Sequence, residues 1–278
     1  MKIRNYGIIF VVLICFTNSC DNFKNGKTTF GQTKNASPGF DVDHLNIWVK
    51  DPTKAKKCLT EIGFTSVPDS LSAIHEGQGT AGRYFNFLNG YLELIFVNDQ
   101  EEFEENNVEN KQLDFTERAN FDLNEASPFS IALKVKDYRV EKIPFKKVRY
   151  HQDWMEEKSS IFSAENSKLY LNEPSIFVVY PGIEAITFET VTALENTPSE
   201  DSRWKNYFRH PNGAKRITNI VITAHGVNLK TETIRAINSI EHINVKIGGE
   251  HVMELYFDNQ IQGKTFDLRP ALPLMVYL

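Results

Sequence analysis

The chain has 278 residues, which is enough for one large domain or two small ones. Its 31 Lys and Arg residues stand against 36 Asp and Glu, giving a net charge of −5 and a pI of about 5.9. This balance excludes the basic surface typical of nucleic-acid-binding proteins, so we expect no nucleic-acid partner.

The N-terminal segment has the parts of an export signal. Lys2 and Arg4 precede an apolar run over residues 6–16, which is too short for a spanning helix of about 20 residues. Residues 17–20 (TNSC) then resemble a lipobox, although Thr17 stands where Leu is usual. The sequence therefore predicts a signal peptide over residues 1–19.

Cys20 is the expected lipidation site. The alternative is plain secretion, with cleavage after Ser19 and no lipid. Lipidation fits the cysteine count: Cys15 would leave with the signal and Cys20 would become a thioether, so only Cys58 would remain as a free thiol and no internal disulfide could form. We expect a lipoprotein of the cell envelope that contacts the membrane through its lipid alone, with residues 20–40 as the lipidated cysteine and a flexible tether.

The folded part begins with a βαβββ pattern. Alternating apolar residues predict a first strand, and Asp51-Pro52 and Gly63 are typical of the start and end of a helix. Asn89-Gly90 is a strong hairpin signal. The expected elements are strands at 42–49, near 64–67, at 84–88 and at 91–97, and a helix at 52–61.

This order recurs twice, less regularly. The second copy is expected to have strands at 129–135, 175–180 and 183–191, with at most two helical turns before Pro144. The third is expected to have strands at 217–224, 252–257 and 266–278 and a helix at 231–240.

Two polar connections separate the copies. Residues 99–125 contain ten acidic and two basic residues, and we interpret them as a solvated face. Residues 194–215 carry Trp204, Tyr207 and Phe208, which we expect to hold a loop against the core.

The repeated order and three motifs resemble the glyoxalase-like members of the vicinal oxygen chelate superfamily. The motifs are Asp43-His44-Leu45, the segment 77–83 (GQGTAGR) and the segment 91–95 (YLELI). The resemblance implies an α+β fold of βαβββ modules forming curled mixed sheets around a cleft. We expect a glyoxalase-like domain of two modules at 41–192, the second degenerate, a linker at 193–215 and a third βαβββ-like module at 216–278.

In that superfamily a divalent metal, such as Zn, Mn, Fe or Ni, lies in the cleft. The resemblance implies His44 and Glu93 as metal ligands, with Glu93 also moving a proton. The second copy offers Ser130 and Ala185 at the matching positions, and Glu184 is one place away, on the other face of a strand. The alternative is that His44 and Glu93 line the cleft without metal.

The Gly-rich segment supplies the expected substrate-binding residues His75, Thr80 and Arg83. Its backbone N–H groups could hold an anion, with Arg83 as the counter-charge. Equally, its glycines could only serve a loop that needs positive φ.

Two classes of function follow. The first is an enzyme, a lyase, isomerase or dioxygenase-like protein acting on a small oxygenated molecule. The alternative is a non-catalytic lipoprotein that binds a small molecule or serves a structural role. We expect the first two modules to share the cleft, and the third to extend the assembly or to pair across a homodimer interface.

Overall fold

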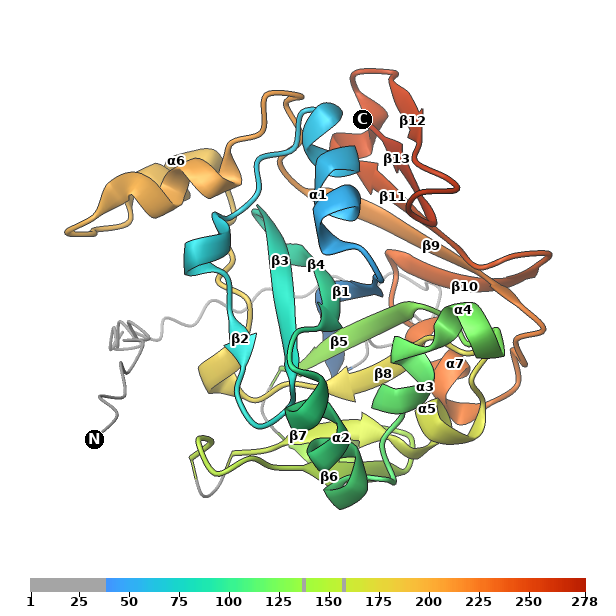
Figure 1. The fold of residues 1–278 in the computed structure, drawn as a ribbon. Helices are drawn as coiled ribbons and strands as arrows, with labels where there is room; N and C mark the ends of the chain where they lie inside the picture. The colour runs from blue at the N-terminus through green and yellow to red at the C-terminus, as the bar shows by residue number, and fades with distance from the viewer. Residues whose placement is uncertain (1–38, 137–138, 157–158) are drawn as a thin grey trace, which may run out of the picture. The chain divides into compact units, whose positions relative to one another are not determined.

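The computed structural model describes residues 39–136, 139–156 and 159–278. Two sheets and short helices make up this part of the chain (Figure 1), which confirms the expected α+β class. None of the helices in these ranges has the length and hydropathy needed to cross a bilayer. The expected signal peptide, the lipidated Cys20 and nearly all of the tether lie outside the described residues.

The first module has the expected βαβββ order. Its elements are β1 (Phe40–Trp48), α1 (Pro52–Glu61), β2 (Ile74–His75), β3 (Thr80–Phe87) and β4 (Gly90–Val97). Asp51 caps α1 through a 2.9 Å hydrogen bond from the Lys54 N–H, and Gly63 follows the helix at φ +87°. No strand forms at the expected position 64–67 of this described segment, because the strand that pairs with β3 lies at Ile74–His75.

The second module has four strands like the first, but among its described residues only a 3-10 turn at Val140–Lys142 follows its first strand, and its α-helix comes before the last strand. Its elements are β5 (Phe129–Val135), β6 (Lys147–Tyr150), β7 (Ile161–Ala164), α5 (Glu165–Leu169) and β8 (Ser175–Val178). Together the modules form one sheet in the order β2-β3-β4-β1-β5-β8-β7-β6. β1 runs parallel to β4, β5 runs parallel to β8, and β1 and β5 meet as antiparallel neighbours at the centre.

The expected strand at 183–191 was wrong. Pro181–Ile183 form a 3-10 turn, and the chain then runs without strand pairing to α6 (Val191–Asn196). The physical reason lies in β8, which is already paired with β5 on one side and β7 on the other, so no edge remains for a further strand.

The acidic connection forms α2 (Gln100–Glu109), α3 (Phe115–Ala119) and α4 (Phe121–Asn124). It is only partly a solvated face, because Phe103 and Ala119 are buried against Trp48 and Ile95 of the sheet. Arg118 is buried at 1% exposure, where it binds Asp114 at 2.7 Å and donates to four backbone carbonyl oxygens. The connection is therefore anchored in the core and covers one end of the sheet.

The C-terminal segment forms a separate sheet. Its elements are β9 (Ile217–His225), α7 (Glu232–Ile237), β10 (Ile243–Gly248), β11 (Val252–Phe257), β12 (Thr265–Asp267) and β13 (Leu274–Tyr277). The strand order is β10-β9-β11-β13-β12, and β9 runs parallel to β10. This order differs from that of the two modules, in which the first strand runs parallel to the last.

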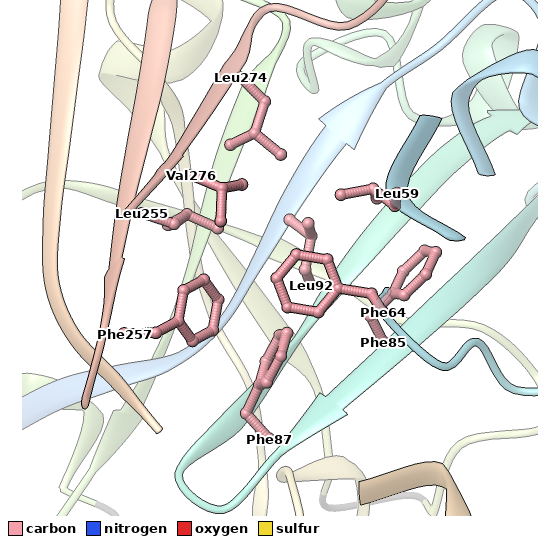
Figure 2. Close-up of a pocket in the computed structure, with 9 residues that line it drawn as sticks. All are labelled: Leu59, Phe64, Phe85, Phe87, Leu92, Leu255, Phe257, Leu274 and Val276. Atoms are coloured by element: carbon pink, nitrogen blue, oxygen red, sulfur yellow. The ribbon is translucent and has the colours of Figure 1, made fainter. Parts of the chain in front are cut away.

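An apolar core joins the two sheets. Figure 2 shows the side chains that meet there, all of them carbon-only: Leu59, Phe64, Phe85, Phe87, Leu92, Leu255, Phe257, Leu274 and Val276. We call the face of the first sheet that carries Phe85 and Leu92 the outer face. The opposite face, which carries Glu93, is the inner face.

The linker after α6 packs as expected. Phe208 is buried, and Trp204 packs against it and Phe188 at ring-centroid distances of 5.9 Å and 6.0 Å. These aromatics hold the 3-10 helix Ser202–Phe208 against Leu88 and Leu194.

Candidate functional site

The inner face collects the polar residues of the central strands. Residues paired across a sheet point to the same side, and residues two apart on a strand do so as well. Asn46 is paired with Glu93, while Leu45 is paired with Leu92 of the outer face. His44 stacks on Tyr91 at a centroid distance of 4.2 Å, which places His44, Asn46, Tyr91 and Glu93 on the same face.

His44 is held by Asp43, the residue before it. A bulge in the β1–β5 pairing at this point turns both side chains to a shared position, and Nδ1 of His44 lies 2.6 Å from Oδ1 of Asp43. The backbone N–H of Ala185 donates to both Asp43 oxygens, at 3.1 and 3.0 Å. A carboxylate can only accept hydrogen bonds, so Nδ1 of His44 carries the hydrogen and Nε2 is left as an acceptor.

Burial keeps this imidazole neutral. The side chain of His44 is packed between Tyr91 and Phe177, and burial lowers its pKa, an effect that the Asp43 hydrogen bond only partly offsets. The Asp43–His44 pair is therefore a fixed acceptor at neutral pH.

Glu93 is the centre of a second cluster. It is 3% exposed, and its Oε1 accepts a 3.1 Å hydrogen bond from the Tyr84 hydroxyl. Nε2 of His75 lies 3.3 Å from the same oxygen and 3.0 Å from the Tyr84 hydroxyl. Nδ1 of His75 is in turn 2.7 Å from Oγ1 of Thr80, a fully buried side chain.

Burial shifts the pKa values of the titratable members of this cluster, Glu93, His75 and Tyr84, toward their neutral forms. Burial raises the pKa of Glu93 to about 7, although the Tyr84 hydrogen bond favours the ionised form. Burial lowers the pKa of His75 to about 4, with a smaller contribution from the charge that His44 carries when it is protonated. The 3.3 Å pair has the spacing of an ion pair, but desolvation outweighs the attraction, so near pH 7 Glu93 exchanges a proton beside a neutral His75.

The Gly-rich segment does hold an anion, and that anion belongs to the chain. The N–H groups of Gly77 and Gly79 donate to the two carboxylate oxygens of Glu102 on α2, at 2.6 and 3.1 Å. Both glycines have positive φ, +75° and +70°. The two alternatives for this segment are thus compatible, since the positive φ values create the anion-binding N–H pair.

Arg83 is not brought to this site. It is paired with Leu94, so its side chain is on the outer face, where it lies over Phe96 and 3.2 Å from Asp69. A strand residue one place from Gly82 and Tyr84 must point away from them. The prediction that Arg83 joins His75 and Thr80 at one ligand site therefore does not match the geometry.

The donor set does not form a metal site. His44 could still offer Nε2, but Ser130 is no ligand for such an ion, and residues 183–191 form no strand that would bring a further ligand to His44 and Glu93. Nowhere in the described ranges do three His, Cys, Asp or Glu side chains gather so that they could hold an ion. A catalytic metal normally has three protein ligands, so the residues present do not fit the divalent metal implied by the resemblance.

Three members of the site were not expected from the sequence: Asp43, Tyr84 and Tyr91. Strand alternation already placed Tyr91 on the same face as Glu93, and that signal could have identified it. Nothing local in the sequence indicated that Tyr84 would contact Glu93, because this contact depends on the β3–β4 register.

Comparison with one solved structure supports this fold, and two others match at lower TM-scores. A hypothetical protein from Staphylococcus aureus matches 85% of this chain and 98% of its own length, at 11% identity and a TM-score of 0.52, which shows a shared fold. Methylmalonyl-CoA epimerase from Mycobacterium tuberculosis matches 50% of this chain and 87% of its own, at 15% identity and a TM-score of 0.32. A methylmalonyl-CoA epimerase in complex with methylmalonyl-CoA and NH4+ matches 52% and 96%, at 14% identity and a TM-score of 0.33.

No curated protein sequence matches the chain. The model of one protein family, described as a glyoxalase-like domain, matches residues 42–237. This match covers both modules, the linker and the start of the second sheet. The chain therefore belongs to the glyoxalase-like domain family.

Proposed function

We propose that the protein is a metal-independent acid–base enzyme, an isomerase or lyase, that moves a proton on a small oxygenated molecule at the inner face. The observation that carries this proposal is the buried Glu93, whose pKa of about 7 suits a group that both accepts and returns a proton at neutral pH.

The surrounding residues have distinct roles in this proposal. Glu93 takes a proton from the carbon next to a carbonyl group. The Tyr84 hydroxyl and His75 fix the position of Oε1, and Thr80 holds His75 from the other side. Nε2 of His44 is the second acceptor on the face, and it would bind a hydroxyl hydrogen of the same molecule.

A sequestering protein is the second candidate. Two hydrogen bonds join the segments that follow the two edge strands of the first sheet, β6 and β2. Gln152 Nε2 donates to the Gly77 carbonyl at 3.1 Å, and Trp154 Nε1 donates to the Glu76 carbonyl at 2.9 Å. A closed inner face would also suit a protein that captures a small molecule without turnover.

Hydrogen exchange into the substrate separates the two candidates. Hydroxyacetone, dihydroxyacetone and pyruvate are incubated in heavy water with the full-length protein in detergent, and proton NMR follows the hydrogens next to each carbonyl. Catalysed exchange in at least one compound, reduced by about 10²–10⁴ in Glu93→Gln, supports the enzyme. Glu254→Gln, a carboxyl change in the second sheet, is the matched control.

The pH and metal dependence sharpen this test. The exchange rate should rise as the pH passes through about 7, because Glu93 must be ionised to accept a proton. Chelator treatment should leave the rate unchanged. Binding without exchange in any of the compounds would favour the sequestering protein.

We also propose that the protein is held at the cell envelope by a lipid on Cys20. The export signal and the TNSC motif of residues 17–20 support this proposal. Membrane fractionation of the wild type and of Cys20→Ser tests it.

A further inference from the structure

A row of polar side chains crosses five strands of the first sheet. Strand pairing aligns Tyr84 with Glu93, Glu93 with Asn46, Asn46 with Ser130, and Ser130 with Ser175. Each pair shares the inner face, so the row runs from β3 through β4, β1 and β5 to β8. The proposed proton transfer uses Glu93 and Tyr84 at one end of this row and leaves Asn46, Ser130 and Ser175 without a role.

The rest of the row is buried, and one of its polar atoms lacks a partner. Asn46, Ser130 and Ser175 are 5%, 4% and 6% exposed. Oδ1 of Asn46 is fully buried and accepts no hydrogen bond. Among the described residues, this oxygen is the one atom of the row that is fully buried without a partner. Buried polar groups are almost always paired, so the Asn46 oxygen indicates a missing hydrogen-bond donor next to Glu93, and the two serine side chains continue the row beyond it.

The charges of the inner face indicate which molecule fits. Asp43 and Glu93 are acidic, and burial keeps His44 and His75 neutral. The nearest arginine in sequence, Arg83, is on the outer face. Alternation also puts Lys134 on this face, four residues along β5 from Ser130 and opposite Asp41. The row itself contains Glu93 and no cationic side chain, so an anionic ligand would meet repulsion there, whereas a neutral hydroxylated one can form hydrogen bonds with its members.

We propose that Asn46, Ser130 and Ser175 form a subsite that recognises the hydroxyl groups of a neutral hydroxylated carbonyl compound whose reacting carbon lies at Glu93. This inference rests on the proposed function and names its substrate class. Oδ1 of Asn46 accepts from a ligand hydroxyl, and the serine hydroxyls donate to and accept from the next hydroxyls along the chain of the ligand.

The spacing of the row sets the length of the ligand. Neighbouring strands are about 4.8 Å apart, so a three-carbon molecule at Glu93 reaches Asn46 and Ser130. Ser175 is one strand further away, and only a longer molecule reaches it.

The test is a binding series on the full-length protein in detergent. Acetone, hydroxyacetone and dihydroxyacetone differ only in the number of hydroxyl groups, and erythrulose extends the chain to four carbons. Ligand-detected NMR titration should show affinity rising about tenfold with each hydroxyl. Equal affinity for acetone and dihydroxyacetone would overturn the subsite.

Serine variants show which residue binds which hydroxyl group of the ligand. Ser130→Ala should weaken dihydroxyacetone binding about tenfold, and Ser175→Ala should weaken only erythrulose binding. Ser239→Ala, which removes a serine hydroxyl outside the first sheet, should change neither. Unchanged binding of both ligands in Ser130→Ala and Ser175→Ala would contradict the proposal.

Asn46→Leu separates a ligand-binding role from a structural one. Removal of an unpaired buried acceptor should leave the melting temperature unchanged or raise it, while dihydroxyacetone binding falls about tenfold. A lower melting temperature with unchanged binding would mean that the amide serves the fold. If this variant does not fold, the serine variants decide.

The outcome distinguishes this subsite from the proposed function. Glu93→Gln should keep the hydroxyl-dependent affinities and lose hydrogen exchange. Hydroxyl-dependent binding without exchange in the wild type would refute the enzyme and leave the subsite standing. Exchange without any hydroxyl preference would refute the subsite alone.

Discussion

Replacement of Glu93 by Gln should change how the stability of the protein depends on pH. The carboxyl has a pKa of about 7 in the folded chain against 4.5 for an unperturbed one, because the folded protein buries it. A group whose pKa is raised on folding stabilises the protein fully below its unfolded pKa, and that contribution is lost as the pH rises through the folded value.

The size of the effect follows from the two pKa values. Their difference corresponds to about 3 kcal/mol, lost by the wild type between about pH 4.5 and 7. Glutamine does not ionise, so Glu93→Gln should not show this loss. His210 has its pKa lowered to about 4 by burial and acts in the opposite sense, but it is present in both proteins and cancels in the comparison.

The assay is urea unfolding of both proteins at a series of pH values from 4 to 8. The free energy of unfolding of the wild type, minus that of Glu93→Gln, should fall by about 3 kcal/mol across this range. Glu254→Gln is a control of opposite sign. Burial of Glu254 opposes its ionisation, but hydrogen bonds from Tyr256 and Lys246 outweigh this and lower its pKa, so its stabilisation is lost as the pH falls.

A difference between wild type and Glu93→Gln that stays constant within about 1 kcal/mol from pH 4 to 8 would refute the reasoning. Such a result would mean that water or a neighbouring group solvates the Glu93 carboxylate in the folded protein.

Four further changes test separate parts of the structure. Arg118→Met should lower the free energy of unfolding by about 3–5 kcal/mol in urea titrations, since it leaves a buried carboxylate and four carbonyls without their donor. Gly82→Ala should abolish catalysed hydrogen exchange, because its Cβ would collide with the Glu93 carboxylate; normal activity would contradict this placement. Glu102→Gln should speed amide exchange in the Gly-rich segment about tenfold, measured by mass spectrometry, as a charged acceptor is lost. Cys20→Ser should move the protein from the membrane fraction to the soluble one, whereas continued membrane association would refute the lipid anchor.

Local patterns predicted most of the first module, although they placed its second strand at 64–67 instead of Ile74–His75. Alternating apolar and polar residues predicted β1, the Asp51-Pro52 helix start predicted α1, and Asn89-Gly90 predicted the β3–β4 hairpin. Alternation also implied that Glu93 and its strand neighbour Tyr91 share a face.

The remaining elements could not be predicted from local patterns, because they depend on strand pairing between segments that are distant in the sequence. Residues 183–191 have strand-like alternation, but β8 has no free edge to pair with them. β10 at Ile243–Gly248 was not predicted, and its parallel pairing with β9 makes the second sheet unlike the two modules.

The electrostatics of the site were also beyond local patterns. The hydrogen bond from the Gly77 N–H to the Glu102 carboxylate joins residues more than twenty positions apart in the sequence. The contact of His75 with Glu93 depends on the pairing of β2 with β3 and of β3 with β4, which no motif encodes.

The most direct test of the central claim is the ionisation of Glu93 itself. Isotopically labelled glutamate carboxyl groups are titrated by NMR in the full-length protein, and the spectrum of Glu93→Gln identifies the signal. The buried cluster with Tyr84 and His75 predicts a midpoint near pH 7. A midpoint near 4.5, the value of an unperturbed carboxyl group, would contradict an acid–base role for this residue at neutral pH.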